Sequence, residues 1–299
     1  MRPLADFIMR GRVQATLVVA GFAALPLFYW LSAAAACLVL LRRGTQDAMS
    51  VLAWGVLPAA AWLYFGEPNT LMVLLGALGL AALLRGGWPW SRVLLASIGL
   101  GLMYGLILGT AFRGPIDELA GMVQAHMPSM LGGVYQKLTL EEQARLEALI
   151  APVLNGLIAA MLQTVSVLAL LLGRYWQAVL YNPGGFGREY RAIRIPRVAA
   201  LVLVALMLVG PNFGVQVAML TPLCSVPLMF AGLALLHGLV AIGKLSRFWL
   251  VGLYLMLVLF LQAIYPLLVL VAIVDSLIDF RGRLAPARDA DKDSANGEG

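Results

Sequence analysis

Polar side chains that interrupt long apolar stretches are the first candidates for chemistry in this chain. Five of them stand out: Asn155, Gln163, His237, Gln262 and Asp275. Ionisable groups are costly to bury in apolar segments, so His237 and Asp275 mark candidate functional positions, and the three amides are their uncharged companions. His237 has the chemistry of a proton relay or a ligand contact, and equally that of a neutral packing residue. Asp275 is either a coupling carboxylate or one end of an ion-pair ladder, because Asp279 and Arg283 follow at helical spacings of four.

A second group of candidates lies in LYNPGGFGREYRAIRIPR, which follows one of the longest apolar runs. The candidates for holding a ligand or an anionic headgroup are Asn182, Gly184, Gly185, Gly187, Arg188, Arg191 and Arg194. Pro183 ends the preceding helix, and Gly184 or Gly185 is suited to a left-handed cap. Arginines near a membrane surface attract anionic headgroups. The stretch predicts either an anion-binding site or a fastener that fixes a helix end at the surface.

The arginines of this stretch recur at intervals of three: Arg188, Arg191, Arg194 and Arg197. On a helix they would form a slowly rotating basic stripe, with Tyr190, Ile193 and Ile195 facing lipid. The glycines do not match a phosphate-binding loop or a dinucleotide fingerprint. We therefore expect an interfacial helix at the cytoplasmic surface.

The composition predicts whether these residues lie in water or in a membrane. Of 299 residues, 62% are hydrophobic and 12% are charged, against about 45–50% and about 25% in soluble domains. The apolar residues form blocks near or above the ~20 residues that cross a membrane: 13–41, 48–65, 70–84, 92–112, 149–180, 198–220, 222–243 and 248–280. The predicted fold class is an all-α polytopic transmembrane helical bundle.

Several other functions find no support in the sequence. The net charge of +6 comes from basic residues at the ends of apolar blocks, which indicates membrane topology and not nucleic-acid binding. Cys37 and Cys224 lie inside apolar stretches without metal-ligand spacing, so we expect neither a metal nor a cofactor. Nucleophile-elbow, zinc-protease and intramembrane aspartyl motifs are absent, and we expect no enzyme.

The threading depends on Pro26, in the middle of block 13–41. A hairpin that turns near Pro26 places the N-terminus and the basic clusters, including 188–197, in the cytoplasm. The last block, 248–280, contains Pro266 and is either one span or a broken pair. We expect about nine membrane segments, within a range of eight to ten.

The chain divides into four expected parts. Residues 1–181 form a six-segment membrane bundle, with an extracytoplasmic surface insert at 113–148 whose TLEE sequence predicts a capping box between Thr139 and Glu142. Residues 182–197 form the Gly/Arg-rich interfacial loop, 198–283 form the C-terminal membrane helices, and 284–299 form a disordered tail. The run SAAAAC imitates a signal-cleavage site but belongs to an uncleaved first membrane segment.

Small residues recur every fourth position in block 92–112: Ser97, Gly101, Gly105 and Gly109. They place a smooth face on one side of a helix, which lets a neighbouring backbone approach closely. This face predicts packing inside the bundle or, alternatively, an oligomer interface.

Several motifs together resemble those of a known family: NPGGFGREYRAIRI, GLALLHG, LIDFRGR and LPLFYWLSAAAACLVLLRRG. Over roughly residues 10–283 the chain resembles the YybS-like predicted membrane proteins of bacteria, a family without an established activity. The resemblance implies the bacterial cytoplasmic (inner) membrane. It also implies an N-terminal half similar to the substrate-binding S components of energy-coupling-factor vitamin transporters, with six helices and both ends in the cytoplasm. The motifs lie largely in or beyond the sixth segment, so no vitamin-site residues are carried over.

These observations lead to two alternative functions. The first is an inner-membrane protein that binds or transports a small molecule or a lipid intermediate. The second is a non-transporting scaffold whose basic cytoplasmic face recruits protein partners or anionic lipids in envelope assembly. Membrane lipids are expected partners in both, and nucleic acid in neither.

Overall fold

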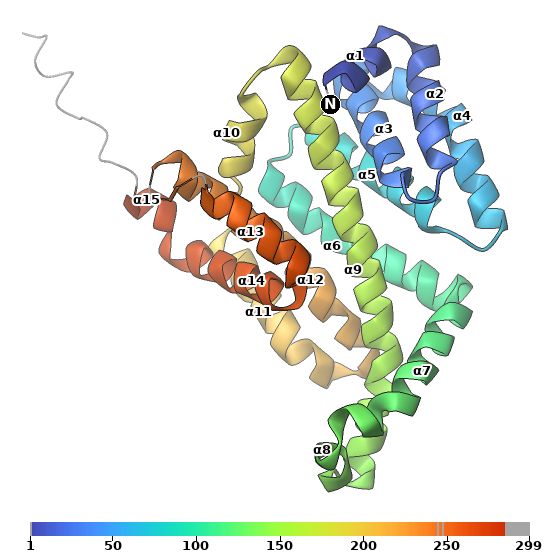
Figure 1. The fold of residues 1–299 in the computed structure, drawn as a ribbon, viewed down its shortest axis with the longest axis vertical. Helices are drawn as coiled ribbons and strands as arrows, with labels where there is room; N and C mark the ends of the chain where they lie inside the picture. Colours follow the sequence, from blue (N-terminus) through green and yellow to red (C-terminus); the bar gives the residue numbers. More distant parts are fainter. Residues whose placement is uncertain (1, 244, 247, 285–299) are drawn as a thin grey trace, which may run out of the picture.

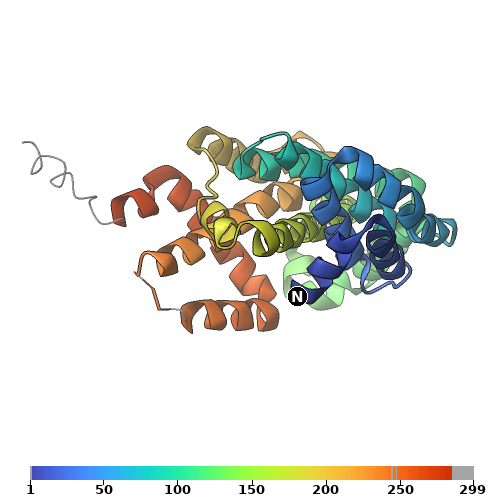
Figure 2. The same ribbon diagram turned by 90° about the horizontal axis from the view of Figure 1, so that it is seen from above.

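The computed structural model describes residues 2–243, 245–246 and 248–284, and in these residues the chain is helical without strands. The predicted all-α fold is therefore confirmed for the described chain. Helices α1 to α5 lie on one side of the long helix α9 (Leu140–Tyr181), and α11 to α15 lie on the other (Figures 1 and 2). Of the expected tail, only Leu284 is among the described residues, where it ends α15 (Phe280–Leu284).

The N-terminal hairpin turns where the sequence predicts. Helix α1 (Arg2–Arg10) leads into α2 (Arg12–Ala23), and the chain returns as α3 (Tyr29–Arg43). Residues 24–28, which include Pro26, form the turn between α2 and α3. The Ser32 hydroxyl fastens the hairpin by donating to the Val19 carbonyl at 2.7 Å.

Helix α3 is the centre of the first group of helices. Every residue from Ser32 to Leu41 is buried, and α3 packs against α2, α9 and α5 (Asn69–Arg85), with α4 (Thr45–Tyr64) beside α2. Small side chains permit this close packing. A Cβ added to Gly173 of α9 would lie 2.8 Å from the Ala34 carbonyl oxygen of α3. The alanine run that imitates a cleavage site is thus core.

Helix α6 (Trp90–Ala111) packs through its small-residue stripe against α9 and α12. The Asn155 amide donates to the Gly105 carbonyl at 2.9 Å, and the Gln163 amide donates to the Ser97 hydroxyl at 2.8 Å. Gly101 leaves room for Gln163, whose oxygen would lie 2.6 Å from an added Cβ. The expected internal packing of this stripe is confirmed.

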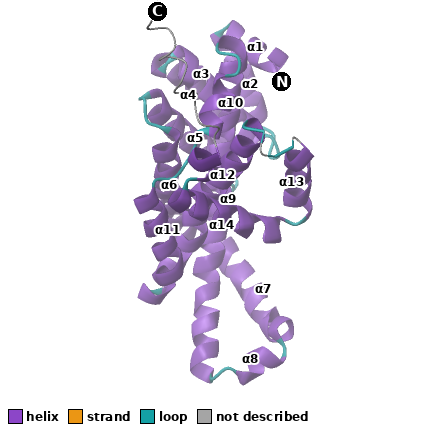
Figure 3. Ribbon diagram, turned by 90° about the vertical axis from the view of Figure 1, so that its left-hand side faces the viewer, coloured by secondary structure: helices purple, strands orange, loops and turns teal. Residues whose placement is uncertain are grey.

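An outer hairpin projects from the bundle (Figure 3). It consists of α7 (Arg113–Leu131), α8 (Gly133–Lys137) and the first turns of α9. The capping box is confirmed: the Glu142 amide donates to the Thr139 hydroxyl at 3.3 Å, and the Thr139 amide donates to the Glu142 carboxylate at 2.8 Å. Helix α9 has 42 residues and is roughly 63 Å long. It continues without a break from the insert into the bundle, as the sequence predicts.

The second group begins with α11 (Arg197–Val209) and continues through two short 3-10 turns (Gly210–Phe213, Val215–Met219) into α12 (Leu220–Ala241). The last apolar block is a broken pair, α13 (Phe248–Leu259) and α14 (Leu261–Ile278). The break lies at Phe260 rather than at Pro266, which sits inside α14. The proline falls in the second turn of α14, where its missing donor removes only the hydrogen bond to the Gln262 carbonyl.

Four helical segments of the described chain are long and apolar enough to span a membrane: Trp90–Ala111, Leu140–Tyr181, Gln216–Ala241 and Leu261–Ile278. Four shorter apolar segments accompany them: Arg12–Ala23, Asn69–Arg85, Arg197–Phe213 and Phe248–Leu259. The membrane character predicted from composition is therefore supported by helices of the required length.

Candidate functional site

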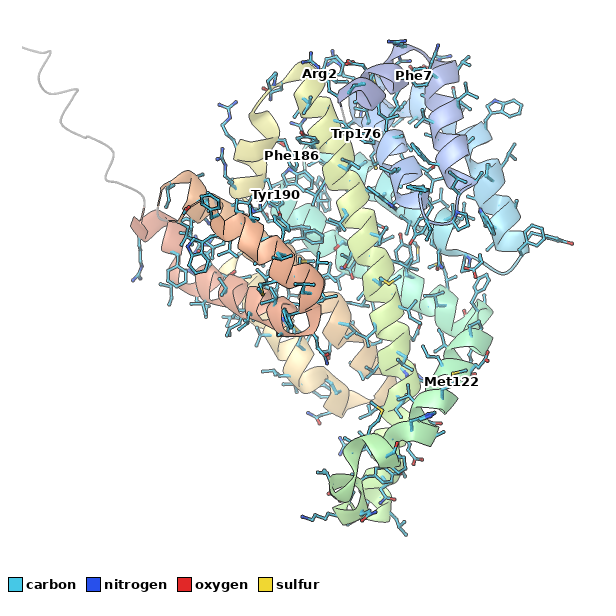
Figure 4. All side chains as sticks on the ribbon, viewed as in Figure 1. Arg2, Phe7, Met122, Trp176, Phe186 and Tyr190 are labelled. Atoms are coloured by element: carbon cyan, nitrogen blue, oxygen red, sulfur yellow. The ribbon has the colours of Figure 1, made fainter. Side chains whose placement is uncertain are left out.

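A cavity of about 1340 Å³ lies between α9, α12, α13 and α14. Helix α10 (Gly185–Arg191) covers one end, where Phe186 and Tyr190 extend from it toward the cavity (Figure 4). The volume exceeds the ~300–1,000 Å³ of most small-molecule sites. The cavity thus has room for a ligand larger than a typical metabolite.

The walls of the cavity are mainly apolar and extend over most of α12. Lining residues of that helix run from Pro222 to Ala241, a rise of roughly 28 Å. This depth is close to the ~30 Å of membrane hydrocarbon. Among the described lining residues there is no carboxylate, and Arg191 is the single residue with a permanent charge.

A row of aromatic rings crosses the α10 end of the cavity. Its members, from four helices, are Tyr175, Phe186, Tyr190, His237 and Tyr254, and we call them the aromatic row. Successive ring centroids are 5.9, 5.7, 5.4 and 5.8 Å apart, within the range of favourable aromatic pairs. The row connects α9, α10 and α12 to Tyr254 on α13.

His237 is held in one tautomer by two hydrogen bonds. Its Nδ1 lies 2.9 Å from the Leu233 carbonyl oxygen, and its Nε2 lies 3.3 Å from the Tyr254 hydroxyl. A carbonyl only accepts, so Nδ1 carries the hydrogen, and the Tyr254 hydroxyl is the partner of Nε2. The sequence left packing and ligand contact open for His237, and the structure shows a hydrogen-bonded histidine that also lines the cavity.

Arg191 stands at the same end of the cavity. Its Nε donates to the Gly187 carbonyl at 2.8 Å, which orients the guanidinium along α10. No carboxylate of the described residues forms an ion pair with it. The positive charge of Arg191 therefore has no fixed counter-charge in the described cavity wall.

The opposite end of the cavity is polar without being charged. The Ser225 and Tyr265 hydroxyls lie 2.7 Å apart, and the Gln262 side chain lines the cavity without a hydrogen-bond partner among the described residues. Ser225 lies twelve residues before His237 on α12, which separates the two ends by roughly 18 Å. The cavity thus joins a cationic, aromatic end to a neutral hydrogen-bonding end.

The expected basic stripe does not exist as a single helical face, because α10 ends at Arg191 and the chain is not helical over residues 193–196. Arg194 lies in this link, and Arg197 begins α11. Ile193 and Ile195 are 3% and 0% exposed and do not face lipid. The prediction failed because an X-Pro step at Pro196 favours an extended chain over a continuous helix.

The expected ladder from Asp275 to Asp279 and Arg283 is also wrong. Asp279 adopts φ 60°, which ends α14 and breaks the spacing of four. Asp275 instead pairs with Arg281 at 2.8 Å and accepts from the Phe280 amide at 3.1 Å. Asp279 pairs with Arg194 at 2.8 Å.

These ion pairs fasten the loop that carries α10. Arg194 also donates to the Asp275 carbonyl at 3.0 Å, and Arg281 donates to the Ile193 carbonyl at 2.8 Å and to the Arg191 carbonyl. On the other side of α10, Glu189 forms a two-pronged ion pair with Arg174 of α9. The loop therefore contains both fastening arginines and, at Arg191, an arginine that faces the cavity.

The remaining predicted residues separate into two sets. Gly184 adopts the expected positive φ of 82°, and Gly184 and Gly187 line the cavity. Asn182 caps α9, and its amide lies against Gly185, which is buried. The cavity brings Gly184 and Gly187 together with Arg191, His237 and Gln262. The predicted residues that do not line it are Asn155, Gln163, Asn182, Gly185, Arg188, Arg194 and Asp275.

Sequence reasoning missed Tyr190 as a cavity residue, and it missed Tyr254, Tyr265 and the Arg174–Glu189 pair altogether. A signal existed for the tyrosines, since a phenol inside an apolar helix needs a polar neighbour. No local signal links Arg174 to Glu189, because the pair forms across the turn between α9 and α10.

The fold and the cavity define an all-helical protein with membrane-length helices and a lateral, mainly apolar cavity. Comparison with protein-family models, with curated proteins and with solved structures finds no match.

Proposed function

We propose that this protein binds a long-chain amphiphile, a lipid or a lipid-like intermediate, in the cavity between α9, α12, α13 and α14. One observation carries the proposal: a mainly apolar cavity as deep as membrane hydrocarbon has polar groups at both ends. A hydrocarbon chain is the ligand that makes use of such a wall.

Helix α13 supports entry from the membrane. None of its described residues is buried, and it packs chiefly on α14. Because the helix is loosely held, its displacement from α9 costs little packing energy. A lipid that enters past α13 would not need to leave the apolar phase.

The orientation forms part of the same proposal. We place the protein in the bacterial inner membrane as a multi-pass protein with about nine segments and a cytoplasmic N-terminus. The basic ends of the helices favour this arrangement. Helices α2 and α13 have 12 residues each and are only roughly 18 Å long. Each would therefore enter the membrane as one arm of a hairpin. The similarity of residues 1–181 to S components, and of the chain to YybS-like proteins, stays a prediction.

The scaffold alternative stays a prediction with less support. It depends on a free basic face, yet Arg194 is engaged by Asp279 and by two carbonyls of α14. Of the predicted stripe, Arg188 and Arg197 are the exposed residues that would carry recruitment.

A cavity-filling substitution tests the proposed function. Met161 of α9 lines the cavity and is 57% exposed. Met161→Trp places a bulky indole ring in the cavity at this position. Overpacking costs ~1–3 kcal/mol, so occupancy by co-purifying long-chain compounds should fall at least about fivefold. Native mass spectrometry of the purified protein measures this occupancy.

The matched control is Leu201→Trp on α11, a 54% exposed position outside the cavity lining. It should leave occupancy unchanged. A wild-type protein that carries no long-chain compound, and whose thermal midpoint no added lipid raises, would contradict the proposed function.

A further inference from the structure

The α10 end of the cavity carries a positive charge that no described lining residue balances. The guanidinium of Arg191 is the one permanent charge among the described lining residues, and it has no ion-pair partner among them. Arg191 is half-buried, so its charge bears part of the cost of desolvation beside the apolar wall. An anionic group bound there would remove this cost.

The guanidinium is positioned before any ligand arrives. Its Nε is occupied by the Gly187 carbonyl at 2.8 Å, while the backbone carbonyl of Arg191 accepts from Arg281. The two terminal nitrogens of the guanidinium donate no hydrogen bond to the described residues. Such groups bind the oxygens of phosphates in a two-pronged geometry.

Space for a headgroup lies beside this guanidinium. A Cβ added to Gly184 would meet no atom within 4 Å, and one added to Gly187 would meet only Arg191 Nη2, at 3.8 Å. Both glycines line the cavity. The absence of side chains there leaves room for a compact polar group next to Arg191.

The neighbouring polar groups add hydrogen bonds without adding charge. Burial, with a smaller contribution from Tyr254, raises the pKa of the Tyr190 phenol well above its usual value, so this phenol stays protonated. Both ring nitrogens of His237 are engaged, by the Leu233 carbonyl and the Tyr254 hydroxyl. Arg191 therefore determines the charge preference of this end.

We propose that the α10 end of the cavity selects a phosphate-type anionic headgroup, with Arg191 as its cation and the space beside Gly184 and Gly187 as its seat. The inference rests on the proposed function, because it assigns the headgroup of the same ligand. The bound molecule is then an anionic lipid with its chain along α12.

Competition between two lipids tests the proposal. The full chain is placed in nanodiscs of phosphatidylcholine with a minor fraction of phosphatidic acid of the same acyl chains, and native mass spectrometry counts the lipids that remain bound. Phosphatidylcholine carries a choline cation that offsets its phosphate charge, so the wild type should enrich the net-anionic phosphatidic acid at least about tenfold.

Three variants separate the role of Arg191 from general basicity. Arg191→Gln should abolish the enrichment while long-chain occupancy remains, and Arg191→Lys should retain a measurable part of it. Arg188→Gln, on the same short helix but outside the cavity lining, should enrich phosphatidic acid as the wild type does. Equal loss in Arg188→Gln and Arg191→Gln would overturn the inference in favour of a diffuse surface charge.

The outcomes distinguish the two proposals. Bound lipid without a preference for phosphatidic acid overturns the headgroup assignment and leaves the proposed function standing. No bound lipid of either kind overturns both. A thermal stabilisation by inorganic phosphate equal to that by phosphatidic acid would identify a site for a soluble anion and overturn the lipid assignment.

Discussion

Helices α3 and α13 are apolar and of similar length, yet α3 is largely buried and α13 is not. Helix α3 has 15 residues and a run of ten that are buried, whereas α13 has 12 residues and none that is buried. The middle of α3 carries four successive alanines and packs against α2, α5 and α9, whereas α13 carries Trp249, Tyr254 and bulky aliphatic residues and packs chiefly on α14. Small residues let helices approach closely. The first group of helices is thus a compact scaffold, and the second leaves space for a ligand.

The largest expected effect is the loss of the anchor that holds α14. Asp275→Asn removes one partner of the ion pair with Arg281, whose side chains are 3% and 16% exposed. Breaking a buried pair costs ~3–5 kcal/mol, because the remaining charge is left without a partner. The second group should then loosen, with a lower thermal midpoint in detergent.

The control for this prediction is an exposed pair of the same kind. Asp117→Asn breaks the ion pair with Arg113, whose side chains are 48% and 70% exposed. It should cost ~0–1 kcal/mol. Equal midpoints for the two variants would show that Asp275 does not anchor α14.

A smaller effect compares one glycine from each region. In Gly173→Ala the new methyl group meets the Ala34 carbonyl and the Cys37 side chain, each 2.8 Å away, at a cost of ~1–3 kcal/mol. In Gly252→Ala on α13 the methyl group meets nothing within 4 Å, and helix propensity favours alanine by ~1 kcal/mol.

Thermal unfolding of both variants measures the contrast. Gly173→Ala should unfold at a lower temperature than the wild type and Gly252→Ala at the same or a higher one. Similar destabilisation of both would mean that α13 is packed as tightly as α3.

The smallest effect concerns the outer hairpin, which is fixed by local bonds. Hydrogen bonds from the Thr139 amide and hydroxyl lower the pKa of the Glu142 carboxyl. A lowered folded-state pKa stabilises the folded state above the ordinary carboxyl pKa, and this contribution is lost as pH falls through the lowered value. Thr139→Ala should reduce hydrogen-exchange protection of the first turn of α9 about fivefold near neutral pH.

Acidification provides the check on this mechanism. Protection in the wild type should fall as the carboxyl protonates, and Thr139→Ala should show a smaller fall, because it keeps the backbone amide donor and loses only the hydroxyl. A wild-type protection that does not change with acid would contradict a role for the Glu142 charge. The bundle helices should keep their protection in both proteins.

Sequence reasoning succeeded where the deciding interactions are local. Pro26 produced the turn, Thr139 and Glu142 formed their cap within four residues, and the small-residue stripe of α6 met a neighbouring helix. Each signal is contained in one segment, so composition and spacing predict it. The apolar blocks likewise predicted most of the helices.

The cavity could not be predicted in the same way, because its residues come from helices far apart in the chain. Arg281 lies ninety residues from Arg191 in sequence and binds its carbonyl, and no spacing rule links them. The basic stripe failed at Pro196, where the chain becomes extended, so Arg191 and Arg194 received different partners. His237 and Gln262 both line the cavity, and only the packing of α12 on α14 places them in one space.

The guanidinium of Arg281 touches the Asp275 carboxylate and the carbonyls of Arg191 and Ile193. A protein shortened just before this residue would keep every long apolar helix of the described chain but would leave Asp275 without its counter-charge. It would also lose the hydrogen bonds from Arg281 that hold α10 and the following link over one end of the cavity. Expression tags and fusions therefore belong after residue 284, and a chain trimmed to its hydrophobic part is the wrong reagent for lipid measurements.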